Sequence, residues 1–292
     1  MPPELSILIV NYNTRAKLAE CLDSLLAHQG GLALEILVVD NGSKDASAEL
    51  VKGYPAPVRL IHEGTNTWFS GGYNLAFEQA RGEFVFILNP DTIVLPDTLS
   101  LLVDYLRQYP NVSAVTCRME YPTDRELQRT CSALPRYLDL VLGYTFLGAL
   151  LPFWRDARRQ RMWYSAWERD STRAVEVAPG SCILARRSLL QTVGVFDPRQ
   201  RLYFTEDDLC WRIQQAGGTI HFVAQAILLH YERSSVQQVQ RLASRIYFED
   251  MLVYCRNRYG VLRTLLLGAL VAPTRWLMDM VQRLRGERTQ LA

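Results

Sequence analysis

Several features are missing from this chain of 292 residues, and each absence argues against a class of protein. The six cysteines lie far apart and form no C-x-x-C pair, which argues against a disulfide framework and favours buried thiols in a reducing compartment. Lysine is scarce, since only Lys17, Lys44 and Lys52 stand among the 32 basic residues. Arginine suits phosphate and carboxylate recognition, although genome base composition produces the same bias. The formal net charge of +2 is too small to favour a nucleic-acid partner.

An uninterrupted apolar segment long enough to cross a membrane is also absent. A spanning helix needs about 20 apolar residues in succession, and the apolar residues 138–154 contain Asp139. The apolar run at 261–281 is interrupted by four residues: Arg263, Pro273, Arg275 and Asp279. No basic stretch precedes an apolar run at the N-terminus, which argues against a signal peptide. We therefore expect a cytoplasmic protein whose two apolar segments are candidates for a peripheral contact with the inner face of the cell membrane.

Strand and helix patterns alternate in the first part of the chain. Short, nearly continuous apolar runs predict buried strands at 5–10, 34–39, 58–62 and 84–88. Helical spacing of apolar residues follows the first strand, and further helices are expected after the second strand, before the fourth and after Pro96. Such an alternation is typical of a mostly parallel sheet with helices on both faces, so the sequence predicts an α/β fold.

The pattern also suggests how the chain is divided. Prolines, an apolar segment and a basic-aromatic stretch interrupt the alternation, and regular structure resumes afterwards, ending in a long helix near 237–257. We expect one domain and a C-terminal helical region, in four parts: a first half at 1–118, an insertion or lid at 119–174, a second half at 175–235, and the helical region at 236–292.

Polar residues gather where three of the predicted strands end, at 11–13, 40–43 and 89–91. In open α/β sheets, ligands bind beyond the carboxyl ends of the strands. Asp40 could accept a hydrogen bond from a ribose hydroxyl or a base N–H, and Tyr12 could stack on the base. Alternatively, Asp40 is the N-cap of the next helix, and Tyr12 is a rim residue of the core.

Two residues are candidate ligands of a divalent cation. Asp91 follows a buried strand, and Mg²⁺ typically takes one or two carboxylates plus substrate phosphates. Such a cation neutralises a departing nucleotide diphosphate. His230 ends the apolar run at 226–229 and could add a ligand. The alternatives are a type I turn at 89–91 and a hydrogen-bonded edge histidine.

The segment 66–74 contains two adjacent glycines and leads into a helix pattern near 75–80. Glycines let a backbone approach a ligand, and a helix N-terminus favours phosphate or polar sugar groups. The segment matches neither G-x-G-x-x-G nor G-x-x-x-x-G-K-[ST], so a plain turn explains it equally well.

Three consecutive acids, Glu206, Asp207 and Asp208, precede a helix pattern that starts near Leu209. Neighbouring acids repel one another, so a folded protein retains them for a helix cap, a metal or catalysis, and negative charge is favourable at a helix N-terminus. One of them could remove the proton of an acceptor hydroxyl as a general base. A capping role alone is the alternative.

Taken together, these segments resemble the inverting family-2 glycosyltransferases, in particular a bacterial rhamnosyltransferase-like branch. They occur in the family's order between about residues 5 and 235. The matching segments are 6–13, 38–43, 66–74, 88–91, 177–181, 196–197, 203–212 and His230.

The resemblance implies a GT-A fold, which is a Rossmann-like, mostly parallel sheet with helices on both faces, followed here by the C-terminal helices. It implies inverting transfer of a sugar from a nucleotide diphosphate, with a lean towards dTDP-rhamnose or another hexose nucleotide, to a glycan or polyprenyl-linked acceptor in surface polysaccharide synthesis. The implied cofactor is Mg²⁺ or Mn²⁺.

The resemblance also implies roles for individual residues. Asp207 is the expected general base, with Glu206 as the alternative, and Asp91 and His230 are the expected metal ligands. The nucleotide-sugar would contact Val10, Tyr12, Asp40, Asn66, Gly72, Asn74, Asn89 and Asp91. The donor sugar or acceptor would contact Gly180, Ser181, Asp208 and Trp211.

The sequence departs from the family pattern at three places. Asn89 stands where many relatives carry an acid, Trp68 stands where glycine is common, and the segment 205–208, with its acids at 206–208, is one residue out of register with a frequent spelling. Two other functions stay open on the residues alone. A sugar nucleotidyltransferase would carry a Gly-rich loop with Arg and Lys near the first strand, which 11–14 lacks. A non-catalytic nucleotide-sugar-binding module would not need to retain the acids.

Overall fold

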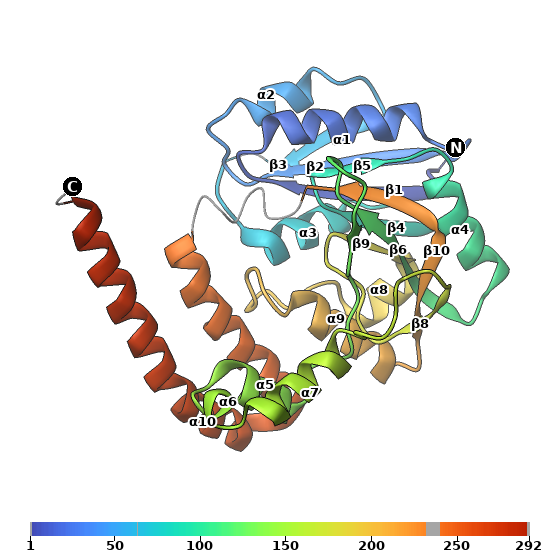
Figure 1. Ribbon diagram of the computed structural model, residues 1–292. Helices are drawn as coiled ribbons and strands as arrows, with labels where there is room; N and C mark the ends of the chain where they lie inside the picture. Colours follow the sequence, from blue (N-terminus) through green and yellow to red (C-terminus); the bar gives the residue numbers. More distant parts are fainter. Residues whose placement is uncertain (1, 63, 232–239, 291–292) are drawn as a thin grey trace.

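The computed structural model describes residues 2–62, 64–231 and 240–290, and within these residues a sheet of ten strands forms the centre of the fold (Figure 1). The strands are β1 Leu5–Asn11, β2 Leu34–Asp40, β3 Val58–His62, β4 Phe84–Leu88, β5 Thr92–Val94, β6 Val112–Glu120, β7 Leu127–Gln128, β8 Arg173–Val175, β9 Cys182–Arg186 and β10 Thr219–His230. Their spatial order is β3-β2-β1-β4-β9-β6-β10-β5, with β7 paired to β6 and β8 paired to β10.

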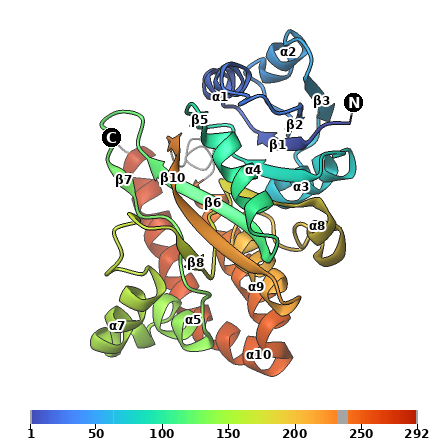
Figure 2. The same ribbon diagram turned by 90° about the vertical axis from the view of Figure 1, so that its right-hand side faces the viewer.

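Helices cover both faces of the sheet, which confirms the predicted α/β fold (Figure 2). They are α1 Arg15–Ala27, α2 Ser47–Lys52, α3 Trp68–Glu78, α4 Thr98–Gln108, α5 Tyr137–Tyr144, α6 Leu147–Leu150, α7 Pro152–Met162, α8 Arg187–Val193, α9 Thr205–Gln215 and α10 Gln240–Gln290. Apolar residues of α1, α2 and α4 form the core on one face, and those of α3, α8 and α9 form the core on the other.

The sheet is mixed rather than mostly parallel. Strands β1 to β4 pair in parallel as predicted, with Leu5 opposite both Leu34 and Phe84. In contrast, β9 runs antiparallel to both β4 and β6, and β5 runs antiparallel to β10. A strand buried on both faces has the same apolar pattern in either direction, so the sequence could not reveal how β9 enters the sheet.

Two helices begin earlier than the sequence pattern suggested. Helix α3 starts at Trp68, so the predicted glycine loop is largely helical. A Cβ atom on Gly72 would lie 2.8 Å from Val10 Cγ1, which shows that the glycine allows α3 to pack closely on β1. Helix α9 starts at Thr205 rather than near Leu209, so the three acids lie inside its first turn.

The part of the chain predicted as an insertion contains α5, α6 and α7, which lie beside the bend of α10 at one end of the molecule (Figure 1). Leu140 of α5 shares an apolar cluster with Met251, Tyr254 and Leu267 of α10. Helix α10 turns at Gly260, whose φ of 81° and ψ of 176° are not helical.

Part of α10 also meets a criterion for membrane spans. The segment Ser244–Met278 is long and apolar enough to cross a membrane by length and composition alone.

Three predictions concern residues outside those the structure describes: the segment 232–235, the domain boundary after residue 235 and the start of the long helix near 237. The four-part division of the chain stays a prediction.

Candidate active site

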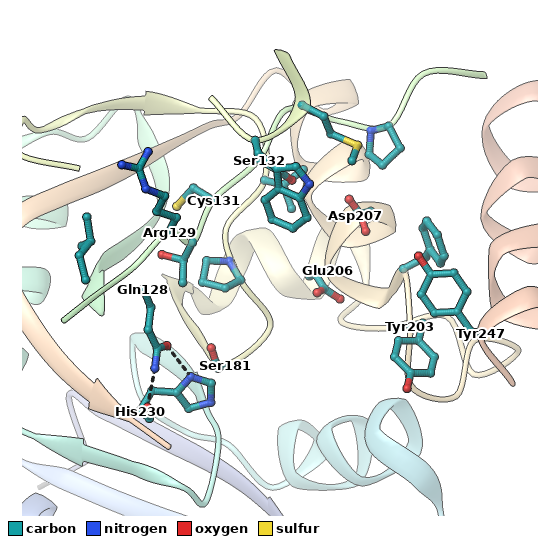
Figure 3. A pocket seen from close by; sticks show the side chains of 18 of the residues that line it. Gln128, Arg129, Cys131, Ser132, Ser181, Tyr203, Glu206, Asp207, His230 and Tyr247 are labelled. Atoms are coloured by element: carbon teal, nitrogen blue, oxygen red, sulfur yellow. Dashed lines mark hydrogen bonds between the residues drawn. The ribbon is translucent and has the colours of Figure 1, made fainter. Parts of the chain in front are cut away.

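A cavity of about 470 Å³ lies where the first turn of α9, the segment between β7 and α5, and the end of β10 meet (Figure 3). The carboxyl groups of Glu206 and Asp207 lie on one side of it, and His230 with Gln128 lies on the other. Much of the wall is aromatic, with lining side chains that include Tyr121, Tyr144, Trp163, Tyr203, Phe204 and Tyr247. The cavity therefore combines an acidic pair, an imidazole and flat apolar surfaces of the kind that pack against sugar rings.

The acidic pair lies in the first turn of α9. Phe204 precedes the helix in the left-handed conformation, with φ of 55°. Burial raises the pKa of Glu206, and the Thr205 hydroxyl, which donates to Glu206 Oε2 at 3.0 Å, and the Gly180 backbone N–H partly oppose this rise. Burial, followed by the negative charge of Glu206, raises the pKa of Asp207 well above its ordinary value. A carboxyl group with a raised pKa is suited to proton transfer near neutral pH.

On the opposite side, the sheet brings Asp91 to His230 although they are far apart in the sequence. Strand β5 runs antiparallel to β10 and places Thr92 opposite His230, so Asp91 lies beside the imidazole. The distance from Asp91 Oδ1 to His230 Nε2 is 3.4 Å. Gln128 holds the other ring nitrogen, with 3.0 Å between His230 Nδ1 and Gln128 Oε1 (Figure 3).

These contacts suit a divalent cation. When the amide oxygen of Gln128 accepts the Nδ1 proton, a neutral imidazole presents its Nε2 lone pair towards Asp91. His230 Nε2 is buried and makes no hydrogen bond to the described residues. Among the residues that the structure describes, no third His, Cys, Asp or Glu side chain joins this pair to form a group that could hold a metal ion. The protein would therefore supply two ligands, and substrate phosphates and water would supply the others, as is usual for Mg²⁺.

Asp40 has a structural role at the same edge of the sheet. Its Oδ1 accepts hydrogen bonds from the backbone N–H groups of Gly42 and Ser43 at 3.1 and 2.8 Å, and its Oδ2 accepts one from Asn11 Nδ2 at 3.0 Å. Gly42 has φ of 78°, and a Cβ atom there would lie 2.1 Å from the Gly64 carbonyl oxygen, so only glycine fits. Asp40 is not the N-cap of α2, because that helix begins at Ser47.

Three asparagines that we predicted to bind the nucleotide-sugar make bonds within the protein. Asn66 accepts a hydrogen bond from the backbone N–H of Trp68 at the start of α3. The side-chain amide of Asn74 bonds to both the N–H and the C=O of Phe196. Asn89 Oδ1 lies 3.3 Å from the Tyr73 hydroxyl, which donates to it.

The structure thus brings together only some of the predicted site residues. Glu206, Asp207, Ser181 and His230 line the cavity, Asp91 contacts His230, and a Cβ atom on Gly180 would lie 3.6 Å from Glu206 Oε2. The predicted nucleotide-binding residues outside its lining are Val10, Tyr12, Asp40, Asn66, Gly72, Asn74, Asn89 and Asp91, of which Asp91 contacts the lining residue His230. Binding roles for these residues stay predictions.

Asp208 and Trp211 are not brought to the cavity, contrary to our expectation from the sequence. They line a different depression, on the side of α9 that carries Arg212. Asp208 is 1% exposed and pairs with Arg212 at 2.8 Å and with Asn257 at 3.0 Å. Arg212 also donates to the carbonyl oxygens of residues 193, 194 and 195. Asp208 therefore anchors α9 in the fold, and we assign it no contact with substrate.

Replacing Asp208 by alanine is expected to lower the free energy of unfolding by about 3 kcal/mol, because it leaves the charge of Arg212 without its buried partner. Urea denaturation measures the loss. The matched control is Asp104→Ala, which breaks an exposed pair with Arg107 at 3.1 Å and should cost less than about 1 kcal/mol. Equal losses in the two variants would refute the anchoring role.

Sequence patterns gave no sign of several cavity residues. Gln128 lies in a strand of only two residues, and neither its type nor its spacing indicated that it would hold His230. Tyr247 comes from α10, beyond the segments that resemble the family. The helical spacing of Tyr247, Met251 and Tyr254 marks one apolar face of that helix, which was the single available signal.

The fold and the cavity define a glycosyltransferase with a GT-A fold, and known proteins agree. The chain belongs to glycosyl transferase family 2, since the protein-family model described as "Glycosyl transferase family 2" matches residues 6–194.

Two curated relatives are named for rhamnosyl transfer and for O-antigen biosynthesis. The chain is 28% identical to the N-acetylglucosaminyl-diphospho-decaprenol L-rhamnosyltransferase of Mycobacterium tuberculosis, over 94% of this chain and 89% of the relative. It is 29% identical to the O-antigen biosynthesis protein RfbC of Myxococcus xanthus, over 80% of this chain and 18% of that much longer protein.

Solved structures support the fold. The mannosyltransferase PcManGT of Pyrobaculum calidifontis, in complex with GDP-Man and Mn²⁺, has a TM-score of 0.55 at 19% identity, over 97% of this chain and 81% of that chain. GalNAc-T7 with UDP, GalNAc and Mn²⁺ has a TM-score of 0.59 at 15% identity, over 78% of this chain and 44% of that chain.

Proposed function

We propose that this enzyme transfers a sugar from a nucleotide diphosphate to a hydroxyl group of a lipid-linked glycan, with inversion at the anomeric carbon, in the synthesis of a cell-surface polysaccharide. One observation carries the proposal: Glu206 and Asp207 face the His230–Asp91 pair across a single cavity. The relative named for rhamnosyl transfer to a decaprenyl diphosphate acceptor supports both the class of acceptor and rhamnose as the first donor to test.

In the proposed reaction, Asp207 accepts the proton of the acceptor hydroxyl while that oxygen bonds to the anomeric carbon. The bond between the anomeric carbon and the diphosphate oxygen breaks on the opposite face, and its electron pair leaves with the nucleoside diphosphate. Glu206 is held by Thr205 and Gly180, so we assign it to positioning and to raising the proton affinity of Asp207.

Asp91 and His230 are the residues that would hold Mg²⁺ or Mn²⁺ in this enzyme. A cation bound there supplies positive charge that stabilises the departing diphosphate. The edge of the sheet formed by the ends of β1 and β2, with Tyr12 and Asp40, is the proposed place for the nucleoside.

The decisive experiment incubates the purified protein with a panel of nucleotide-sugars, dTDP-rhamnose included, with Mg²⁺ or Mn²⁺ and a lipid-linked N-acetylglucosaminyl diphosphate acceptor. We expect release of nucleoside diphosphate together with a glycosylated acceptor, and NMR of the product reports inversion. Formation of nucleoside triphosphate and sugar 1-phosphate when inorganic diphosphate is added would instead indicate a nucleotidyltransferase. Binding without any turnover would indicate a non-catalytic module.

Arg258 is expected to move the acid limb of the pH–rate profile to lower pH. Burial and Glu206 raise the pKa of Asp207, and the positive charge of Arg258 opposes them. In Arg258→Gln, Asp207 therefore keeps its proton to a higher pH, and the acid limb of kcat/KM moves to higher pH, whereas Arg258→Lys restores it. The other groups near Asp207 are Asp208, which stays paired, and tyrosines of raised pKa, which stay neutral: Tyr144, Tyr247 and Tyr254. An unmoved acid limb would contradict the assignment.

We also propose that α10 beyond its bend and α6–α7 touch the membrane surface. Leu262 and Leu265 are exposed on α10, and Phe153 and Trp154 are exposed on α7. Leu262→Glu with Leu265→Glu should reduce sedimentation with phosphatidylglycerol vesicles at least several-fold. Leu101→Glu, which changes an exposed leucine on α4, should leave it unchanged. Equal sedimentation of all three proteins would refute the contact.

A further inference from the structure

A second hollow of about 600 Å³ adjoins the catalytic cavity. Its lining residues are Arg129, Arg155, Asp156, Arg159, Gln160, Trp163 and Ser165. Arg129 and Trp163 line both hollows, so the two adjoin at these side chains. Figure 3 shows Arg129 on the side of the catalytic cavity away from Tyr203 and Tyr247.

The second hollow is positively charged and offers donors for an anion. Arg129 pairs with Glu168 at 2.6 Å, and Arg155 pairs with Asp156 at 2.9 Å. Arg159 is exposed and forms no ion pair with any residue that the structure describes, so three guanidinium groups face two carboxylates. Planar guanidinium groups bind phosphate oxygens through two parallel hydrogen bonds, which an ammonium group cannot do.

Exposed apolar side chains directly precede the arginines of this hollow in the chain. Leu150 is 68% exposed, Phe153 is 78% exposed and Trp154 is 59% exposed, all at the α6–α7 junction. Trp154 is adjacent in sequence to Arg155, and α7 carries both Phe153 and Arg159. Along the chain, the exposed apolar residues at 150–154 therefore lead into the arginines of the second hollow, which adjoins the catalytic cavity at Arg129 and Trp163.

We propose that the second hollow binds the diphosphate of a polyprenyl-linked acceptor. The prenyl chain lies over the exposed apolar residues of α6–α7, and the acceptor sugar passes Arg129 and Trp163 to reach Asp207. A lipid-linked sugar has its tail, diphosphate and sugar in this same order, which is the match that carries the inference. The proposal rests on the proposed function for its acceptor class.

Kinetics with two acceptors test the assignment. Arg159→Gln should raise KM about tenfold for an acceptor sugar on a prenyl diphosphate, because it loses hydrogen bonds to a charged group. Its kcat, its donor KM and its KM for the same sugar on a neutral alkyl aglycone should stay at wild-type values. Arg59→Gln, an exposed arginine on β3, is the matched control. Equal KM increases for both acceptors, or no increase, would overturn the proposal.

A binding measurement separates this proposal from the proposed function. Farnesyl diphosphate is titrated in EDTA, where no metal can hold a diphosphate at the donor site, and tryptophan fluorescence is followed because Trp163 lines the hollow. Wild type should bind farnesyl diphosphate about tenfold more tightly than Arg159→Gln does, and farnesol should bind equally to both. This difference supports the diphosphate site even when no sugar is transferred, and equal affinities refute it.

Phospholipid head groups offer the same phosphate chemistry, and a vesicle experiment distinguishes them. Arg159→Gln should sediment with phosphatidylglycerol vesicles as wild type does. Loss of sedimentation with unchanged affinity for farnesyl diphosphate would assign Arg159 to the membrane and overturn the acceptor site.

Discussion

Replacing Asp207 by asparagine is expected to lower kcat by about 10³-fold or more, because the amide cannot accept the proton of the acceptor hydroxyl. The affinity for the nucleoside diphosphate should stay within a few-fold of wild type, since Asp207 lies across the cavity from His230. Initial rates of nucleoside diphosphate release and calorimetric titration measure the two effects.

Glu206→Gln is the control for this experiment. It keeps the size of the side chain and removes the charge that raises the pKa of Asp207, so it should reduce kcat less than Asp207→Asn does. A larger loss in Glu206→Gln would transfer the role of base to Glu206, and wild-type turnover in Asp207→Asn would remove the proposed base altogether.

Asp91→Ala is expected to produce the second large effect, on metal-dependent binding. With Mn²⁺ present, the variant should bind the nucleoside diphosphate about 100-fold more weakly than wild type, because one of two protein ligands is lost. In EDTA the two proteins should bind it alike. Titrations with and without Mn²⁺ give the four affinities.

Gln128→Leu tests the same site through its support. The substitution removes the group that orients the His230 ring and should weaken metal-dependent binding about tenfold.

Equal affinities of wild type and Asp91→Ala in Mn²⁺ would exclude Asp91 as a ligand, and the charge of the leaving group would then have to be stabilised by other residues.

The sequence alone determined the first half of the fold and the class of enzyme. Strands β3 and β4 have the predicted bounds, and β1 and β2 each extend one residue further. This success has a local cause, because β1, β2 and β4 are almost entirely buried, and such strands are mostly apolar and end where polar residues begin. The eight segments that resemble the family, taken in order along the chain, were sufficient to indicate a family-2 glycosyltransferase.

The composition of the active site was decided by tertiary structure. His230 meets Asp91 only because β5 and β10 are antiparallel neighbours, and Tyr247 reaches the cavity only because α10 packs on α5. Each depends on pairing between segments far apart in the chain, for which a local pattern carries no signal.

The acidic triplet shows the same limit within a single helix. Successive residues of a helix point about 100° apart. Once α9 begins at Thr205, Glu206 and Asp207 face the cavity while Asp208 points to Arg212. The sequence determined that three acids would stand together at a helix N-terminus. Only the position and rotation of that helix in the folded protein decided which of them could meet a substrate.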